Sequence, residues 1–241
     1  MEAMGDSRTR EKVFRFKEFE VKNDLSAMKV GTDGVLLGAW CHVDDAKRIL
    51  DVGTGSGVIA LMLAQRFPKA MITGVDISSD AVQEAIFNVR NSSWSDRITI
   101  IHKDFLTMKI EDGGYDAIIS NPPYFVDSLE APDALRTMAR HSASLDYIHL
   151  IRGASEGLLK EEGILAMISP CEREKDIEDA VIWHKMRIVR KVRIYTSCKK
   201  TVPKRILWEI SRSEIADRVE GTLYLDSDEY RRLTAPFYLD K

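Results

Sequence analysis

Residues 48–58 read RILDVGTGSGV and join a short apolar run to a glycine loop and the start of a helix. The apolar run 48–52 is too continuous for a half-exposed strand and too short for most helices, so it predicts a buried parallel strand. The glycines allow a ligand to approach the backbone closely at a helix N-terminus. Their GxGxG spacing matches neither a dinucleotide fingerprint nor a P-loop. We expect a small-molecule site here. The alternative interpretation, a tight strand-to-helix turn that binds no ligand, is not excluded by the spacing.

Short apolar runs and helical spacing alternate along the rest of the chain. Buried strands are predicted at 48–52, 70–75, 98–101, 115–120 and 163–168, and helices at 58–67, 79–91, 145–159 and 174–186. This alternation is typical of a doubly wound α/β sheet, whose ligands bind at the carboxyl ends of the strands. Residues 187–196 and 205–211 alternate in polarity and predict an antiparallel C-terminal strand pair.

Composition and charge narrow the class of protein. The 241 residues carry a net charge of −3 and are 44% hydrophobic, an ordinary globular composition that excludes disorder and collagen-like repeats. No run approaches the ~20 apolar residues of a membrane helix, and the polar start is unlike a secretory signal, so we expect a cytoplasmic protein. Cys41, Cys171 and Cys198 lack metal-ligand spacing, so neither disulfides nor a metal site is expected.

No linker divides the chain, so the sequence predicts a single domain over residues 1–241. We expect an N-terminal extension and site helix at 1–47, a core sheet at 48–212 and a C-terminal segment at 213–241.

Acidic side chains end the next two predicted strands. Asp76, followed by Ile77, stands where a carboxylate can accept hydrogen bonds from both hydroxyls of a ribose, although it could equally cap the following helix. Asp104 can accept from an adenine amino group, and Phe105 beside it can stack on the ring. Each of these signals is weak alone.

Asn121-Pro122-Pro123-Tyr124 follows the fourth strand and is the most specific signal in the chain. The prolines lack N–H groups and fix an extended chain whose carbonyls stay free to accept. The Asn121 side chain and the Pro122 carbonyl could together hold a planar amino group, while Tyr124 offers a face for a base to stack on. The alternative interpretation is an ordinary Pro-Pro turn with a buried tyrosine and no role in binding.

The order of these motifs resembles the class I S-adenosylmethionine-dependent amino-methyltransferases. Residues 29–40 (KVGTDGVLLGAW), the NPPYF context and the closing FYL at 237–239 are similar to bacterial enzymes that methylate N6 of adenine 37 in a valine tRNA. The resemblance covers about residues 16–239. It implies a mostly parallel seven-stranded sheet, S-adenosylmethionine as cofactor and tRNA as partner.

The resemblance also assigns roles to individual residues. The cofactor would be bound by Thr32, Asp33, Asp51, Gly53, Gly55, Gly57, Asp76, Ile77, Asp104, Phe105 and Asn121, and the target base by Asn121, Pro122, Pro123 and Tyr124. A base inside a stacked loop must be extruded to reach such a site. Arg140 and His141 follow the motif, and the sequence assigns them no role.

Residues 185–205 contain nine Lys and Arg and no acid, although the whole chain is slightly acidic. This excess favours contact with phosphates, and we expect Lys199, Lys200, Lys204 and Arg205 to bind RNA. The competing explanation is a sheet edge protected by charge.

Three other functions stay open at this point. A glutamine-amide protein methyltransferase also uses NPPY after the fourth strand, but only about 47 residues precede the first strand here, which leaves little room for a substrate domain. DNA or ribosomal RNA methylation is a second option. A noncatalytic RNA-binding module is a third, which the intact motif disfavours. The sequence gives no oligomeric state.

Overall fold

The computed structural model describes residues 13–109, 113–123, 145–213 and 218–239. The main strands are β3 (Arg48–Val52), β4 (Met71–Asp76), β5 (Ile98–His102), β6 (Tyr115–Ser120), β7 (Leu159–Pro170), β8 (Arg187–Tyr195), β9 (Arg205–Ser211) and β10 (Val219–Tyr224). The α-helices are α1 (Thr32–Trp40), α2 (Val58–Arg66), α3 (Ser79–Arg90), α5 (Tyr147–Gly153), α6 (Glu174–Trp183) and α7 (Asp228–Thr234). A short hairpin of β1 (Val13–Arg15) and β2 (Glu20–Lys22) precedes them.

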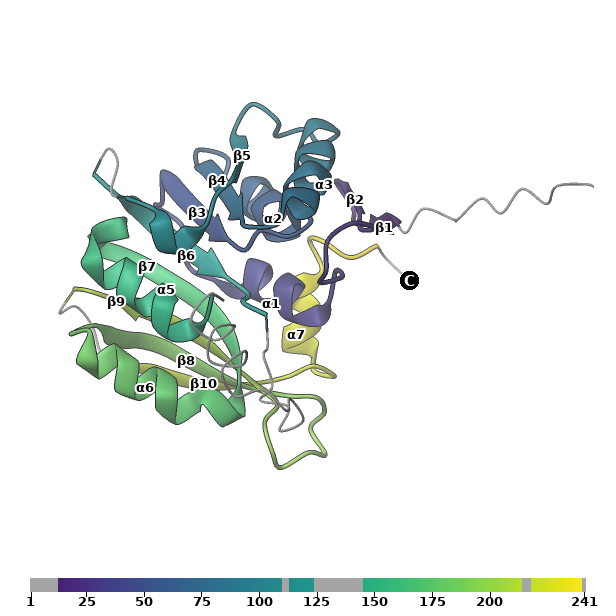
Figure 1. Ribbon diagram of the computed structural model, residues 1–241. Helices are drawn as coiled ribbons and strands as arrows, with labels where there is room; N and C mark the ends of the chain where they lie inside the picture. The colour runs from purple at the N-terminus through teal and green to yellow at the C-terminus, as the bar shows by residue number, and fades with distance from the viewer. Residues whose placement is uncertain (1–12, 110–112, 124–144, 214–217, 240–241) are drawn as a thin grey trace, which may run out of the picture.

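The strands form one eight-stranded sheet in the order β10-β8-β9-β7-β6-β3-β4-β5 (Figure 1). The strands from β7 to β5 in this order pair in parallel, and β9 runs antiparallel to both β7 and β8. The predicted doubly wound, mostly parallel sheet and its antiparallel C-terminal pair are therefore confirmed. The carboxyl ends of β3, β4 and β6 meet at one edge, where the sequence places its motifs.

The prediction of seven strands was wrong, because β10 adds an eighth strand beside β8. It pairs in parallel with β8, from Val219 opposite Arg190 to Tyr224 opposite Tyr195. This strand also lies beyond residue 212, where the core sheet was predicted to end. Only Leu223 of β10 is buried, so an edge strand of this kind leaves no continuous apolar run for sequence analysis to find.

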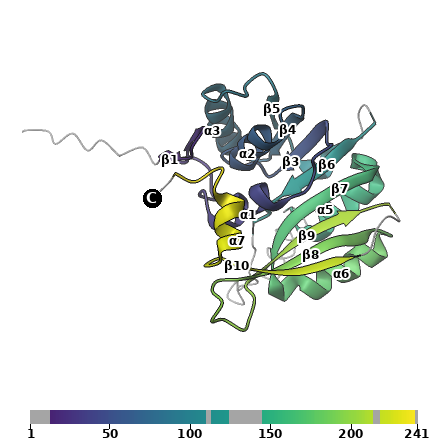
Figure 2. The same ribbon diagram turned by 180° about the vertical axis from the view of Figure 1, so that it is seen from behind.

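Neighbouring residues of β3 belong to two cores, one on each face of the sheet. Ile49 packs with the core formed by α1, α2 and the N-terminal segment, whereas Leu50 packs with α5 and α6. Figure 2, viewed from behind, shows α1 and α7 on the face opposite to α5 and α6. Burial on both faces explains why the strand reads as a continuous apolar run.

Helix α5 is shorter than the predicted helix 145–159. A π-helical turn, Ala154–Leu158, follows it, and Gly157 within that turn has φ 112°, which ends the helical path. Strand β7 starts at Leu159 and extends beyond the predicted strand 163–168 at both ends. No helix in the described residues has the length and apolarity needed to cross a membrane.

Candidate functional site

A cavity of about 750 Å³ opens at the carboxyl ends of β3, β4 and β6, within the usual size range of small-molecule sites. The predicted residues that line it are Thr32, Asp33, Gly53, Gly55, Asp76, Ile77, Asp104, Phe105, Asn121 and Pro123. Asp51, Gly57 and Pro122 are not among the described lining residues, and Tyr124, Arg140 and His141 lie outside the described residues. The fold thus brings four separate motifs to one space.

The glycine loop forms the floor of this cavity. Gly53, Gly55 and Gly57 have φ values of 67°, 56° and 81°, a left-handed region that favours glycine. The amides of Gly53 and Thr54 both donate to the Val75 carbonyl, at 2.9 and 3.0 Å. The Gly55 amide donates to Asp76 at 2.9 Å. Because these amides are engaged within the protein, the loop offers a close-packed surface and no phosphate cradle.

Asp51 supports the loop from behind the cavity wall. Its side chain is wholly buried, and Oδ2 accepts from Thr54 Oγ1 at 2.6 Å and from the Ala60 amide at 3.2 Å. Oδ1 is buried without a hydrogen-bond partner among the described residues. Burial raises the pKa of Asp51 to about 7 despite these two bonds. Its visible role is structural, and its predicted contact with the cofactor stays a prediction.

We expect Asp51→Asn to change how stability depends on pH. Because the folded pKa of Asp51 is raised, its contribution is full below the unfolded value near 3.8 and is lost as pH rises through about 7. The asparagine cannot titrate, so the variant should gain stability relative to the parent between about pH 5 and about pH 8. Urea unfolding of both proteins at the two pH values measures this. If the stability difference between variant and parent is the same at both pH values, the pKa of Asp51 is not raised in the folded protein.

Asp76 joins the glycine loop to α3 and still faces the cavity. Besides the Gly55 amide on Oδ2, its Oδ1 accepts from the Ser78 amide at 2.9 Å, and Ser78 itself caps α3. Each carboxylate oxygen has a further lone pair for a ligand. The capping and ligand-binding interpretations of Asp76 are therefore compatible.

Asp104 and Phe105 form another wall. Asp104 caps the short 3-10 helix Phe105–Thr107 by accepting from the Leu106 amide at 2.9 Å. Phe105 is buried against Gly153 at the end of α5, where an added Cβ would lie 2.7 Å from the ring atom Cζ. The ring is thus fixed in place at the cavity surface.

Asn121 leaves the end of β6 directly into the cavity. Ser120, the last residue of that strand, is buried and donates from Oγ to the Val52 carbonyl at 2.8 Å, which ties β6 to β3. A Cβ added to Gly34 in α1 would lie 3.7 Å from Asn121 Nδ2, so the amide lies beside the first turn of that helix. Asn121 and Pro123 line the same space as the glycine loop.

The N-terminal segment supplies a wall that sequence analysis missed. Residues 26–31 line the cavity ahead of Thr32, and Glu84 and Asn88 of α3 bind the backbone nearby. A signal was present: residues 81, 84, 85 and 88 share one helix face, and two of them are polar on a face otherwise made of alanine. A buried polar pair of this kind indicates specific hydrogen-bond partners.

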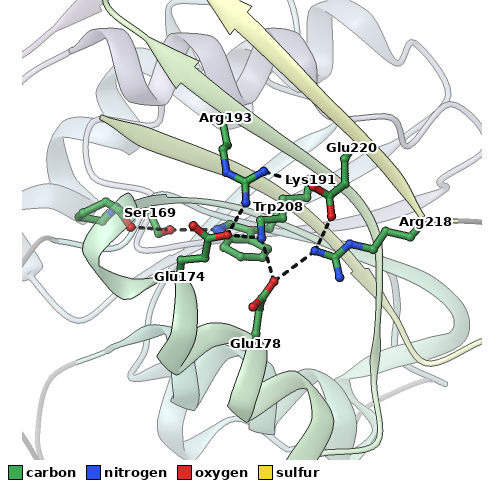
Figure 3. A network of polar contacts seen from close by, with 9 residues as sticks. Ser169, Glu174, Glu178, Lys191, Arg193, Trp208, Arg218 and Glu220 are labelled. Carbon is green, nitrogen blue, oxygen red and sulfur yellow. Dashed lines mark hydrogen bonds and ion pairs between the residues drawn. The ribbon is translucent and has the colours of Figure 1, made fainter. Parts of the chain in front are cut away.

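Several basic side chains of the segment 185–205 form ion pairs with acidic side chains of the protein and are not free to contact phosphates. Lys191 is 1% exposed. Figure 3 shows a closed ring of alternating charge made by Lys191, Glu178, Arg218, Glu220, Arg193 and Glu174. The ring joins α6 to β8 and β10, and Lys191 also lies over Trp208 at 5.0 Å. The number of Lys and Arg residues in this segment therefore overstates the positive charge that is available to bind phosphates.

The four residues assigned to RNA divide into two groups. Arg205 begins β9 and pairs with Asp33 of the cavity lining at 2.8 Å, so it is engaged across the site. Lys199 and Lys200 are exposed in the turn between β8 and β9, as is Lys204. Because Arg205 lies opposite Pro170 at the carboxyl end of β7, this turn stands at the same edge of the sheet as the cavity.

Metal-ligating side chains do not gather in the part of the chain that the structure describes. No group of three or more His, Cys, Asp or Glu there could hold an ion.

Comparison with known proteins adds independent findings. A family model described as the methyltransferase small domain matches residues 26–172. A tRNA1(Val) (adenine(37)-N6)-methyltransferase of Bacteroides thetaiotaomicron is 44% identical over 94% of this chain and 97% of its own length. A protein of the same name from Porphyromonas gingivalis is 45% identical over 94% of both chains.

Solved structures show the same fold at low sequence identity. A predicted O-methyltransferase from Agrobacterium tumefaciens has a TM-score of 0.65 and 20% identity, covering 85% of this chain and 96% of that chain. Pyrococcus horikoshii TYW2, in complex with MeSAdo, has a TM-score of 0.58 and 14% identity over 84% of this chain and 72% of its own.

Proposed function

This chain belongs to the family of tRNA1(Val) (adenine(37)-N6)-methyltransferases, and we propose that its cavity at the carboxyl ends of β3, β4 and β6 binds both the cofactor and the target base. The reaction is transfer of a methyl group from S-adenosylmethionine to N6 of an adenine in tRNA. One observation carries the assignment of the site: Asn121 and Pro123 line the same space as the glycine loop, Asp76 and Phe105.

The described residues fit S-adenosylmethionine. Asp76 has lone pairs for the ribose hydroxyls, and Phe105 gives the adenine a buried ring to lie against. An added Cβ at Gly55 would meet no protein atom within 4 Å, so glycine leaves open space there for the methionine portion. We assign the polar end of the methionine portion to Thr32 and Asp33, because both line the cavity. When bound, the cofactor supplies an electrophilic methyl group on a sulfonium.

We assign to Asn121 and to the backbone carbonyl of Pro122 the orientation of the target amino group; Pro122 itself does not line the cavity, but its neighbours Asn121 and Pro123 do. The lone pair of an adenine amino nitrogen is delocalised into the ring, so this nitrogen is a poor nucleophile. The Asn121 side-chain carbonyl and the Pro122 carbonyl would accept its two N–H bonds, rotating and pyramidalising the amino group so that its lone pair is no longer delocalised and can be aimed at the methyl group. One N–H proton leaves to solvent as the new N–C bond forms and the methyl–sulfur bond breaks. The acceptors also stabilise the positive charge that develops on nitrogen, so no strongly basic side chain is required.

A target base inside a stacked loop reaches this cavity only by extrusion. Tyr124, which lies outside the described residues, stays our prediction for the side chain that replaces part of the lost stacking. Family membership supports adenine 37 of a valine tRNA as the target, and we propose a cytoplasmic location because tRNA is the substrate.

The exposed lysines provide a test of RNA binding. We expect Lys199→Ala with Lys200→Ala to weaken tRNA binding and to make log affinity against log salt shallower by about 0.7–0.9 per lost contact. The matched control is Lys47→Ala with Lys69→Ala, two exposed lysines at the opposite edge of the sheet. Binding measured across a salt series compares them. Equal slopes for both double variants would remove the β8–β9 turn from the RNA surface.

The acceptor class is tested by offering the purified protein alternative substrates with labelled S-adenosylmethionine. We expect label in tRNA, recovered as N6-methyladenosine after digestion to nucleosides. Label in protein glutamine, DNA or ribosomal RNA instead would favour one of the functions that the sequence left open. Binding of tRNA without any transfer would favour a noncatalytic module.

A further inference from the structure

Helix α3 buries two polar side chains that the proposed reaction does not use. Glu84 and Asn88 lie one turn apart on the same face, and each is only 2% exposed. Burying a carboxylate is costly unless it is paired or hydrogen-bonded. The partners of these two side chains therefore show what the face does.

Glu84 binds three consecutive backbone amides of the N-terminal segment. Its oxygens accept from the amides of Asp24, Leu25 and Ser26 at 2.5, 2.7 and 2.8 Å, and from Ser26 Oγ at 2.5 Å. Burial alone would raise the pKa of Glu84, but these hydrogen bonds outweigh it and lower the pKa. The segment thus wraps the carboxylate as a backbone nest wraps an anion.

Asn88 joins the same segment to the glycine loop. Its Nδ2 donates to the Lys22 and Ser56 carbonyls, both at 2.8 Å, and its Oδ1 accepts from the Lys22 amide at 2.8 Å. One side chain therefore contacts the end of β2 and the loop beneath the cavity.

The segment held in this way continues directly into the cavity wall. Residues 23–31 form no regular helix or strand, so the amides of residues 24–26 depend on Glu84 for partners. The next residues, from Ser26 to Gly34, line the cavity.

We propose that Glu84 is a positioning residue that, together with Asn88, holds the N-terminal wall of the cavity in place and thereby sets its affinity for S-adenosylmethionine. This inference rests on the proposed assignment of the cavity. Glu84 does not line the cavity itself; it acts through the backbone of residues 24–26.

Glu84→Gln is the direct test, because an amide nitrogen would then face amide donors. We expect calorimetry to show at least ~10-fold weaker binding of S-adenosylmethionine, the scale of one lost charge-assisted bond. In assays, KM for the cofactor should rise similarly while kcat falls less than about twofold, a split that general destabilisation would not give. Hydrogen exchange at residues 24–26 should accelerate in the protein without cofactor.

Glu209→Gln is the matched control. Glu209 is also a buried carboxylate that accepts a backbone amide, from His42 at 2.7 Å, but it pairs with Arg190 and lies away from the cavity. We expect it to lower stability and leave cofactor affinity unchanged. If Glu84→Gln does not fold, Asn88→Ala tests the same wall and should also weaken cofactor binding.

The outcomes separate this inference from the assignment of the cavity. A parent protein that binds S-adenosylmethionine while Glu84→Gln and Asn88→Ala bind it equally well would overturn the positioning role alone. A parent that binds no S-adenosylmethionine would overturn the proposed cavity and this inference with it.

Discussion

Replacing Asn121 by alanine is expected to lower turnover at least ~100-fold, the usual scale for losing a preorganised group that stabilises the transition state. The reason is that Asn121 lines the cavity beside the first turn of α1, and we propose it as one of the two acceptors for the target amino group. Cofactor binding should stay nearly intact, because Asp76, Phe105 and the glycine loop are unchanged. Single-turnover methyl transfer and calorimetry measure the two effects separately.

Asn91→Ala is the control for this variant. Asn91 is an exposed asparagine at the end of α3, where its side-chain amide donates only to the Phe87 carbonyl among the described residues, so loss of this side chain should leave turnover unchanged. If Asn121→Ala methylates tRNA at the parental rate, the motif after β6 is not the catalytic site.

Removal of the Asp76 carboxylate should have the second largest effect, on cofactor affinity. Each charge-assisted bond to a ribose hydroxyl contributes roughly 1.5–3 kcal/mol, so Asp76→Ala should weaken S-adenosylmethionine binding about 10- to 100-fold or more. The variant also loses the acceptor of the Gly55 amide, which loosens the loop that forms the cavity floor. Calorimetry of the protein with S-adenosylmethionine gives the difference directly.

Asp80→Ala serves as the comparison for Asp76→Ala. Asp80 is an exposed carboxylate in the first turn of α3, close in sequence but absent from the cavity lining. We expect its loss to leave cofactor affinity unchanged. Equal affinities for both variants would remove Asp76 from the cofactor site.

The bounds of strands that are buried on both faces were predicted most accurately. The predicted bounds of β3 and β6 agree with the structure, because neighbouring side chains such as Ile49 and Leu50 enter separate cores and so give a continuous apolar run. It failed for β10, since an edge strand with one buried residue has no comparable pattern.

Contacts between residues far apart in the sequence could not be predicted from sequence patterns. The charge of Lys191 was counted toward an RNA surface, although Glu174 and Glu178 neutralise it from another element. The helix face that carries Glu84 could be found in the sequence, but its partners could not, because they are backbone amides about 60 residues away along the chain. The glycine loop and the motif at Asn121 were identified, because their chemistry lies in consecutive residues.

Methylation of adenine 37 is tested most directly by methyl transfer from labelled S-adenosylmethionine to a valine tRNA transcript and to the same transcript with guanine at position 37. We expect label only in the first transcript, recovered as N6-methyladenosine, with the signal greatly reduced for Asn121→Ala. Equal labelling of both transcripts would contradict adenine 37 as the target. No transfer to either transcript, from a protein that is folded and binds the cofactor, would contradict tRNA adenine methylation itself.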